Sequence, residues 1–259
     1  MIKRFSWTAT TTWLVLLFLH LPVAVLIAYS FNASRYGGRW LGFSFKWYER
    51  LFRDDEIWRA LGYSVAIGLA ATLLSLILGV SGALALHRAR YRLRGLHFSL
   101  LYLPLAVPDI LMGISLLLFF VLLQVPLGVL TIVAAHTSFC VSYVCMVVLG
   151  RLQTFDFTSI EAARDLGATP WQAARLVLLP RLVPAMVSGG LLAFTLSMDD
   201  FVITFFVSGP GSTTLPLRIY SMIKHGSPPL INALSTLLIV FTAAVIAVAQ
   251  RFTKEVPRT

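Results

Sequence analysis

Six long apolar runs, separated by polar segments, constrain this chain more than any other feature. A helix needs roughly 20 mostly apolar residues to cross the hydrocarbon core of a bilayer, and each run is close to or above that length. The runs are too long and too continuous for barrel strands, and backbone polar groups must be satisfied within lipid, so we expect helices. The predicted spans are residues 13–31, 61–86, 98–122, 129–150, 184–207 and 230–250.

The composition agrees with a membrane protein. The chain is 58% hydrophobic and 12% charged, which leaves too little polar surface to cover a water-facing globule. Because the apolar runs continue from end to end, residues 1–259 are predicted to form a single all-α transmembrane domain, with an uncleaved first helix. The net charge of +10 does not indicate nucleic-acid binding, since no basic run stands apart from the spans.

Basic residues predict the orientation of the spans. An arginine comb without acidic neighbours, Arg88, Arg90, Arg92 and Arg94, follows the second run, and Lys3 and Arg4 precede the first. Loops rich in Lys and Arg stay in the cytoplasm, so we expect both termini and the 151–183 loop on the cytoplasmic side.

The two cysteines do not indicate a disulfide or a metal site. Cys140 and Cys145 lie five residues apart in one apolar run and point in different directions on a helix, so they cannot pair. His136 shares a face with Cys140, but two candidate ligands do not make a metal site. We expect no metal in this chain.

The predicted cytoplasmic loop, residues 151–183, has unusually well-defined helix boundaries. Thr158 and Glu161 form a capping box that predicts the start of one helix, and Gly167 is placed to end it in the left-handed conformation. Thr169, Pro170 and Gln172 predict a second helix, limited by Pro180. A rigid helix pair of this kind suits docking to a cytosolic partner.

The same loop carries a spaced motif that resembles the EAA loop of permease subunits of ATP-binding-cassette (ABC) importers. Glu161-Ala162-Ala163, Gly167, Val177 and Leu179-Pro180 follow its spacing and depart from it only by valine in place of isoleucine. The resemblance implies a type I importer permease fold, with Glu161, Ala162, Ala163 and Gly167 contacting an ATPase subunit. The chain has no phosphate-binding G-x-x-x-x-G-K-[ST] motif, so ATP and Mg²⁺ are expected on that partner and no cofactor on this chain.

Three aspartates lie within predicted spans: Asp109 in the third, and Asp199 and Asp200 in the fifth. Charged groups in the membrane are costly and usually functional, and no Lys or Arg lies inside a span to pair with them. A visiting cation would supply the missing charge. The alternative is structural: Asp109 follows Pro108 and could bind backbone freed by a kink, and the adjacent Asp199 and Asp200 cannot both face one point.

Longer stretches resemble the permeases of bacterial spermidine/putrescine importers and their putrescine-specific relatives, among them F-T-L-S-M-D-D at 194–200 and G-P-G-S-T-T-L-P at 209–216. This resemblance implies that polyamine passes Trp47, Asp109, Ser197, Asp199 and Asp200. Carboxylates and an aromatic face suit a flexible polycation.

The predicted function is therefore a non-enzymatic permease subunit of the bacterial inner membrane that imports polyamines. Its expected partners are two ATPase subunits, a second homologous permease, a periplasmic binding protein and membrane lipid. One alternative keeps this architecture and changes the cargo to an aminophosphonate or another amine. A distant alternative is an intramembrane aspartyl protease that uses Asp109 with Asp199 or Asp200.

Overall fold

The computed structural model of the chain describes residues 7–35, 38–88, 92–226 and 228–253, and these residues form helices joined by short connections. Over the described residues the only strand-like pairing is an isolated antiparallel bridge between Asn32 and Phe43. The all-helical prediction is thus confirmed. The elements are α1 (Trp7–Ser30), α2 (Lys46–Phe52), α3 (Asp55–Arg88), α4 (Arg94–Ala106), α5 (Asp109–Leu122), α6 (Val129–Gln153), α7 (Thr158–Asp165), α8 (Pro170–Ala173), a π-helical turn (Ala174–Leu178), α9 (Leu179–Asp199), α10 (Val202–Val207), α11 (Leu215–Lys224) and α12 (Pro228–Thr253).

Four helical stretches in the described part of the chain are each long and apolar enough to cross a membrane: Trp7–Ser30, Asp55–His87, Val129–Gln153 and Pro170–Asp199. They correspond to the first, second, fourth and fifth predicted spans. The sixth corresponds to α12, in which Pro229–Ala244 forms an apolar helix. Of the basic residues that predicted the orientation, Lys3, Arg4 and Arg90 lie outside the described residues.

The third predicted span, 98–122, is a bent pair of helices, so the expectation of one continuous helix was wrong. The chain ends α4 at Ala106, starts α5 at Asp109 and turns by 112° between the two helices. Pro108 has no N–H to continue the α4 hydrogen-bond ladder, and its ring pushes Val107 into an extended conformation, with φ −80° and ψ 130°.

The fifth predicted span, 184–207, is also interrupted. α9 ends at Asp199, Asp200 is extended with φ −66° and ψ 120°, and α10 restarts at Val202. The expectation that Pro180 would limit the preceding loop helix was wrong as well. A π-helical turn at Ala174–Leu178 joins α8 to α9, and this wider turn accommodates a proline that cannot donate a normal helical hydrogen bond.

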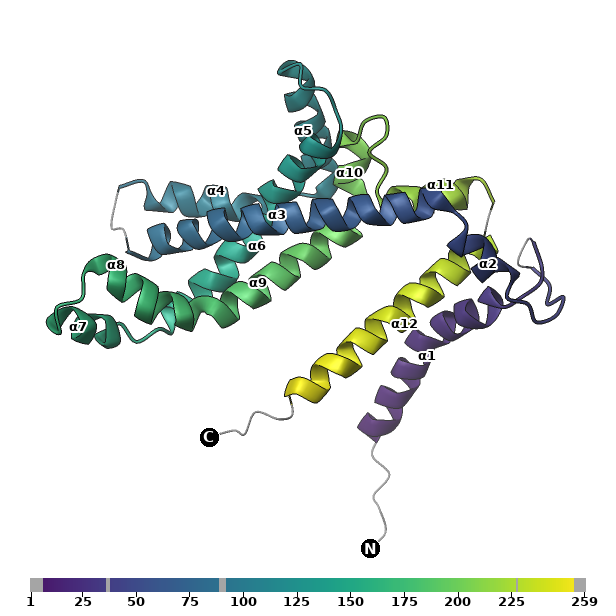
Figure 1. Cartoon of the computed structure of the whole chain (residues 1–259), viewed down its shortest axis with the longest axis horizontal. Coiled ribbons are helices and arrows are strands. Elements are labelled where there is room, and N and C mark those ends of the chain that lie inside the picture. Colours follow the sequence, from purple (N-terminus) through teal and green to yellow (C-terminus); the bar gives the residue numbers. More distant parts are fainter. Residues whose placement is uncertain (1–6, 36–37, 89–91, 227, 254–259) are drawn as a thin grey trace, which may run out of the picture. The chain divides into compact units, whose positions relative to one another are not determined.

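The chain divides into two compact units, each packed mainly within itself. The first contains residues 1–57 and 219–259. In this unit α1 and α12 lie side by side, and α1 begins at the end of the pair where α12 finishes (Figure 1). α2 also packs on α12.

The second unit, residues 58–218, has α6 at its centre. α9, α4 and α10 all pack on α6, and α10 packs on α5 as well. The core of the unit contains the buried side chains of Ile132, Val144 and Leu182. Cys140 and Cys145 are buried and free, as their spacing predicted. This arrangement brings the two helix breaks together around α6.

Candidate transport pathway and coupling site

The two helix breaks lie near each other in the second unit. Gly113, one turn into α5, lies against Ile203, the second residue of α10, and against Phe206. The first turns of α5 and α10 are therefore in contact, and the breaks that directly precede them are neighbours.

Each break combines a helix C-terminus with an aspartate. α4 ends three residues before Asp109, and α9 ends at Asp199. The last carbonyl groups of a helix carry partial negative charge, which attracts cations. The side chains of Asp109 and Asp199 are both exposed on the chain. The starts of α5 and α10 place the positive ends of two helices in the same breaks, so the two carboxylates carry the negative charge that would attract positively charged groups.

Asp200 has a different environment from Asp199, although the two are adjacent. Its carboxylate accepts hydrogen bonds from the N–H of Ile203 at 3.2 Å and from the N–H and hydroxyl of Thr204 at 2.8 and 2.7 Å. It also lies 3.2 Å from Nε2 of His136. The inference that the intramembrane acids have no resident partner was therefore wrong for Asp200, which caps α10 and contacts a histidine.

Sequence reasoning missed His136 as a member of this site. The side chain is 1% exposed and bonds Ser197, Asp200 and Thr204. Ser197 and Asp200, both named as pathway residues, reach this one imidazole. A single histidine in the middle of an apolar span was the only available signal, because its partners lie 61 to 68 residues further along the chain.

Trp47 lies in the first unit and is buried, and its indole N–H is hydrogen-bonded within that unit. Nε1 donates a hydrogen bond to the carbonyl of Asn32 at 2.8 Å. The Asn32 side chain in turn donates to the carbonyl of Arg39 and accepts from the N–H groups of Ser34 and Leu41. Trp47 therefore anchors the loop that precedes α2.

The helix pair of the 151–183 loop forms largely as its sequence predicts. Gly167 has φ +92°, the left-handed conformation expected after α7. At the start of α8, Thr169 Oγ1 accepts from the N–H of Gln172, whose side chain accepts from the N–H of Thr169. The capping box at Thr158, however, was wrong.

Asp156, two residues earlier, caps the start of α7. Its carboxylate accepts from both the hydroxyl and the N–H of Thr158, at 2.7 and 3.0 Å. These hydrogen bonds lower the pKa of Asp156 below its usual value. An aspartate two residues before the helix can accept hydrogen bonds from the unpaired N–H groups of its first turn. Thr158 is less suited to this role, because it already belongs to that turn.

Aromatic packing holds the helix pair to the second unit. Phe155 and Phe157 meet edge to face with ring centroids 4.8 Å apart. The Phe157 ring stacks on His87 of α3 at 4.9 Å, and the Arg181 guanidinium lies 5.9 Å from the Phe155 ring. Phe155 and Phe157, which precede α7, therefore contact both α3 and α9.

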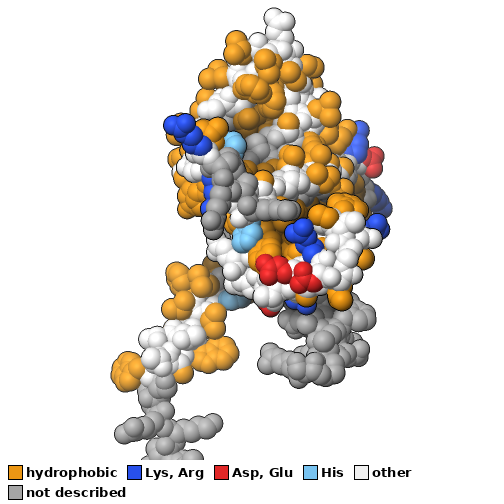
Figure 2. Space-filling model, turned by 90° about the vertical axis from the view of Figure 1, so that its left-hand side faces the viewer, with side chains coloured by type: hydrophobic (Ala, Val, Ile, Leu, Met, Phe, Trp, Pro, Cys, Tyr) orange, Lys and Arg blue, Asp and Glu red, His pale blue; other side chains and the backbone are white. Residues whose placement is uncertain are grey.

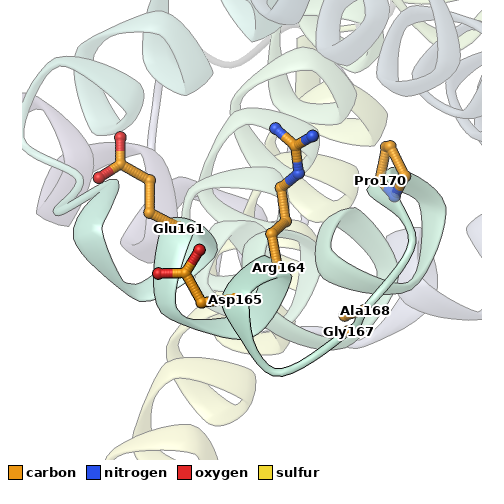
Figure 3. A pocket seen from close by; sticks show the side chains of 6 residues that line it. All are labelled: Glu161, Arg164, Asp165, Gly167, Ala168 and Pro170. Atoms are coloured by element: carbon orange, nitrogen blue, oxygen red, sulfur yellow. The ribbon is translucent and has the colours of Figure 1, made fainter.

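The outer surface of the helix pair combines charge, a recess and exposed apolar side chains. The recess has a volume of about 460 Å³ and is lined by Glu161, Arg164, Asp165, Gly167, Ala168 and Pro170. In Figure 3 the Arg164 side chain stands between the two acidic side chains and Pro170. Leu166 is 89% exposed and Trp171 68% exposed beside it.

The rest of this side of the molecule is mainly apolar. In Figure 2, hydrophobic side chains cover much of the coloured surface, and Asp and Glu side chains are visible as a group at the lower front and separately at the right edge, with Lys or Arg side chains nearby in both places. Of the coupling residues named from the sequence, Glu161, Ala162 and Gly167 are exposed and Ala163 is partly buried. The charged and apolar groups on α7 and α8 are therefore available to a protein partner.

The broken helices and the docked helix pair are features of an ABC importer permease, and sequence comparison places the chain in that class. Residues 71–256 match the family described as binding-protein-dependent transport system inner membrane component. The chain belongs to this family, so it is a multi-pass bacterial inner membrane protein and a transport component rather than an enzyme.

Two curated relatives are similar over nearly the whole chain. The spermidine/putrescine transport system permease protein PotC of Haemophilus influenzae is 41% identical, covering 98% of this chain and 99% of its own. The putrescine transport system permease protein PotI of Escherichia coli K12 is 43% identical, covering 92% and 87%.

Solved structures confirm the type I importer fold. A chain of a bacterial ABC transporter involved in the import of the acidic polysaccharide alginate superposes with a TM-score of 0.76, covering 95% of this chain and 94% of that one. Their sequences are 18% identical, so this similarity concerns the fold alone.

Proposed function

We propose that this chain is one of two homologous permease subunits of a bacterial polyamine importer, with spermidine or putrescine as cargo. The observation that carries the proposal is the pair of neighbouring helix breaks, which present Asp109 and Asp199 beside two helix C-termini. Relatives named for spermidine and putrescine transport, 41% and 43% identical, support the same cargo.

The chemistry of the breaks suits a flexible polycation better than an anion or a sugar. Polyamine ammonium groups are separated by short alkyl chains, so each needs its own acceptor and the linker needs only apolar contact. Carboxylates and helix carbonyl ends provide the acceptors, and irregular backbone within a membrane is tolerated where it lines a pathway. In this proposal Asp109 and Asp199 contact the cargo directly.

The proposed pathway also includes Trp47, Ser197 and Asp200, and their roles differ from those of Asp109 and Asp199. Ser197 and Asp200 bond within the protein, and the Trp47 indole holds the loop before α2. Ser197 and Asp200 hold the backbone of the α9–α10 break in place, and Trp47 holds a loop of the first unit. A cation–π contact from Trp47 would require its buried ring to become exposed during the cycle.

The proposed partners are a second permease, two ATPase subunits and a periplasmic binding protein. Support for the last comes from a similar structure, a bacterial alginate ABC transporter in complex with its periplasmic protein, which superposes with a TM-score of 0.66. ATP and Mg²⁺ would be bound by the ATPase, because this chain has no phosphate-loop motif. Both termini and the α7–α8 pair would face the cytoplasm, as the arginine comb indicates.

The cargo is tested by uptake. The complete complex in proteoliposomes should accumulate labelled spermidine or putrescine when ATP and loaded binding protein are supplied. Asp109→Asn and Asp199→Asn should each lower the uptake rate about tenfold or more without loss of assembly, because each removes a carboxylate charge from the pathway. Asp55→Asn, in the first turn of α3 and outside both breaks, is the charge-matched control. ATP hydrolysis without uptake of either polyamine would refute the cargo.

The docking role of α7 and α8 is tested separately. Deletion of residues 159–180 should abolish copurification of the ATPase subunit with the permease. Leu166→Ser should weaken it, because the substitution removes an apolar side chain that is 89% exposed on the proposed interface. Retained assembly and transport after the deletion would exclude docking through this loop.

A further inference from the structure

The imidazole of His136 forms hydrogen bonds on both sides of the α9–α10 break. Nδ1 lies 2.6 Å from Ser197 Oγ before the break, and Nε2 lies 2.9 Å from Thr204 Oγ1 after it. Asp200, within the break, is 3.2 Å from Nε2. One imidazole on α6 therefore ties together the end of α9, the extended residue and the first turn of α10.

The contacts of Asp200 hold its carboxylate inside the protein. The N–H and hydroxyl of Thr204 donate to Oδ2, and His136 Nε2 lies 3.2 Å from the same oxygen. The N–H of Ile203 donates to Oδ1. A cation that bound Oδ2 would compete with donors that also hold the start of α10.

One arrangement of hydrogens satisfies every polar atom of the cluster. The Thr204 hydroxyl donates to Asp200, and Nε2–H of His136 is shared between Thr204 Oγ1 at 2.9 Å and Asp200 Oδ2 at 3.2 Å. Nδ1 then accepts from the hydroxyl of Ser197, which is 4% exposed. This is the neutral imidazole tautomer protonated at Nε2, and a fully satisfied buried network of this kind holds its members in one geometry.

We propose that His136 is a positioning residue of the transport pathway. By holding Ser197, Asp200 and Thr204 it fixes the backbone at the α9–α10 break, keeps Asp200 engaged inside the protein, and leaves Asp199 as the carboxylate of this pair that meets the cationic cargo. The proposal rests on the polyamine importer function for its cargo, and on the hydrogen bonds of His136 for the geometry. Asp199 is exposed and directly precedes the extended residue, so its direction depends on that backbone.

The test compares two replacements of similar length in the complete, purified complex. His136→Gln keeps an N–H donor near the position of Nε2, whereas His136→Met fills similar space without a donor. We expect His136→Gln to retain most of the polyamine uptake and His136→Met to lower it about tenfold, because the buried acceptors of Asp200 and Thr204 lose their donor. Equal uptake by the two variants would overturn the proposal, since simple packing would then explain the residue.

A second measurement does not depend on the cargo. Asp199→Cys, in a chain whose Cys140 and Cys145 are replaced by alanine, is labelled with a cationic thiol reagent. The labelling rate of Cys at position 199 should change about fivefold or more when His136→Met is added, because methionine removes the N–H donor. It should stay unchanged with His136→Gln, because glutamine keeps a donor. Equal labelling in all three backgrounds would overturn the positioning role. A wild-type complex that takes up no polyamine would instead refute the cargo, so the two failures are distinguishable.

Cys140 provides the matched control. It lies one turn from His136 on α6 and also contacts α9, through a hydrogen bond from Sγ to the carbonyl of Ala193 at 3.4 Å. Cys140→Ala removes this contact without touching Asp200, and it should leave uptake unchanged. If Cys140→Ala lowers uptake as much as His136→Met does, general α6–α9 packing controls the rate and the proposal fails.

Discussion

Gly113 on α5 packs so closely on Phe206 of α10 that a β-carbon at position 113 would lie 2.6 Å from the ring atom Cδ2. This close approach brings the first turns of the two short helices together. The α4–α5 and α9–α10 breaks become neighbours as a result, although they lie about ninety residues apart in the sequence. The proposed cation pathway therefore depends on a glycine that contacts no cargo.

Gly113→Ala should destabilise the second unit, because the added methyl group forces the Phe206 ring and α10 to shift. Overpacking of this kind costs about 1–3 kcal/mol. The thermal unfolding midpoint of the purified complex should fall, and polyamine uptake should fall with it.

Gly82→Ala on α3 is the control for this substitution. A β-carbon there would meet Leu101 Cδ1 at 3.4 Å and Cys145 Sγ at 3.6 Å, which are ordinary contacts. We expect a change of less than about 0.5 kcal/mol. Equal midpoints for the two variants would contradict the close approach of α5 and α10.

Gly167→Ala should weaken coupling to the ATPase, because φ of +92° places any β-carbon in a strained position at the end of α7. The expected cost is about 1–2 kcal/mol, and Gly167→Asn should cost less, since asparagine tolerates the left-handed region. ATPase stimulation by loaded binding protein is the measurement. Gly150→Ala in α6, where a β-carbon meets nothing within 4 Å, should leave it unchanged. An identical response to alanine at both positions would exclude the backbone explanation.

Asn32→Ala should impair the complex at least as much as Trp47→Phe, if Trp47 acts through the loop that it anchors. Asn32 is 1% exposed, and its side chain bonds Ser34, Arg39 and Leu41. Loss of a buried hydrogen-bonding group costs about 1–3 kcal/mol, whereas Trp47→Phe, which loses one hydrogen bond and keeps a ring, should cost about 1 kcal/mol. The thermal unfolding midpoints of the two purified variant complexes measure these costs. Normal stability and uptake in Asn32→Ala, beside loss of uptake in Trp47→Phe, would indicate that the indole contacts cargo directly.

Asp156→Ala should loosen α7, because Thr158 then loses the acceptor of both its N–H and its hydroxyl. Amide hydrogen exchange of residues 158–165 should become faster. Asp165→Ala, at the opposite end of the same helix, removes the same charge from an end where an acid is not favoured, and it should not accelerate exchange. Faster exchange in Asp165→Ala than in Asp156→Ala would contradict the capping role.

The pH dependence of this cap follows from the lowered pKa of Asp156. A carboxyl group whose pKa falls on folding contributes its stability in full above the unfolded value, about 3.9, and loses it as the pH drops through the folded value. Protection of the α7 amides, corrected for intrinsic exchange, should therefore stay constant from about pH 5 to pH 8 and decrease only in stronger acid. A loss of protection near pH 6 would point to a different group.

Local features of this protein were determined by the sequence alone. The left-handed Gly167 and the Thr169–Gln172 capping box were correct because each depends on residues within one turn of one another. The apolar runs predicted the helices for the same reason, since backbone bonds inside lipid must be made within the segment. The spaced loop motif around Glu161 indicated the family that the comparisons confirm.

Only the tertiary structure decided where helices break inside the predicted spans and which side chains meet there. Apolar length does not distinguish a straight helix from a broken pair, so the turn at Val107–Pro108 and the restart after Asp200 were not predicted as breaks. His136 and Asp200 lie 64 residues apart and become partners only because α9 packs along α6. The free energy of the His136–Asp200 contact depends on packing between distant segments, so the sequence pattern of neither segment predicts it.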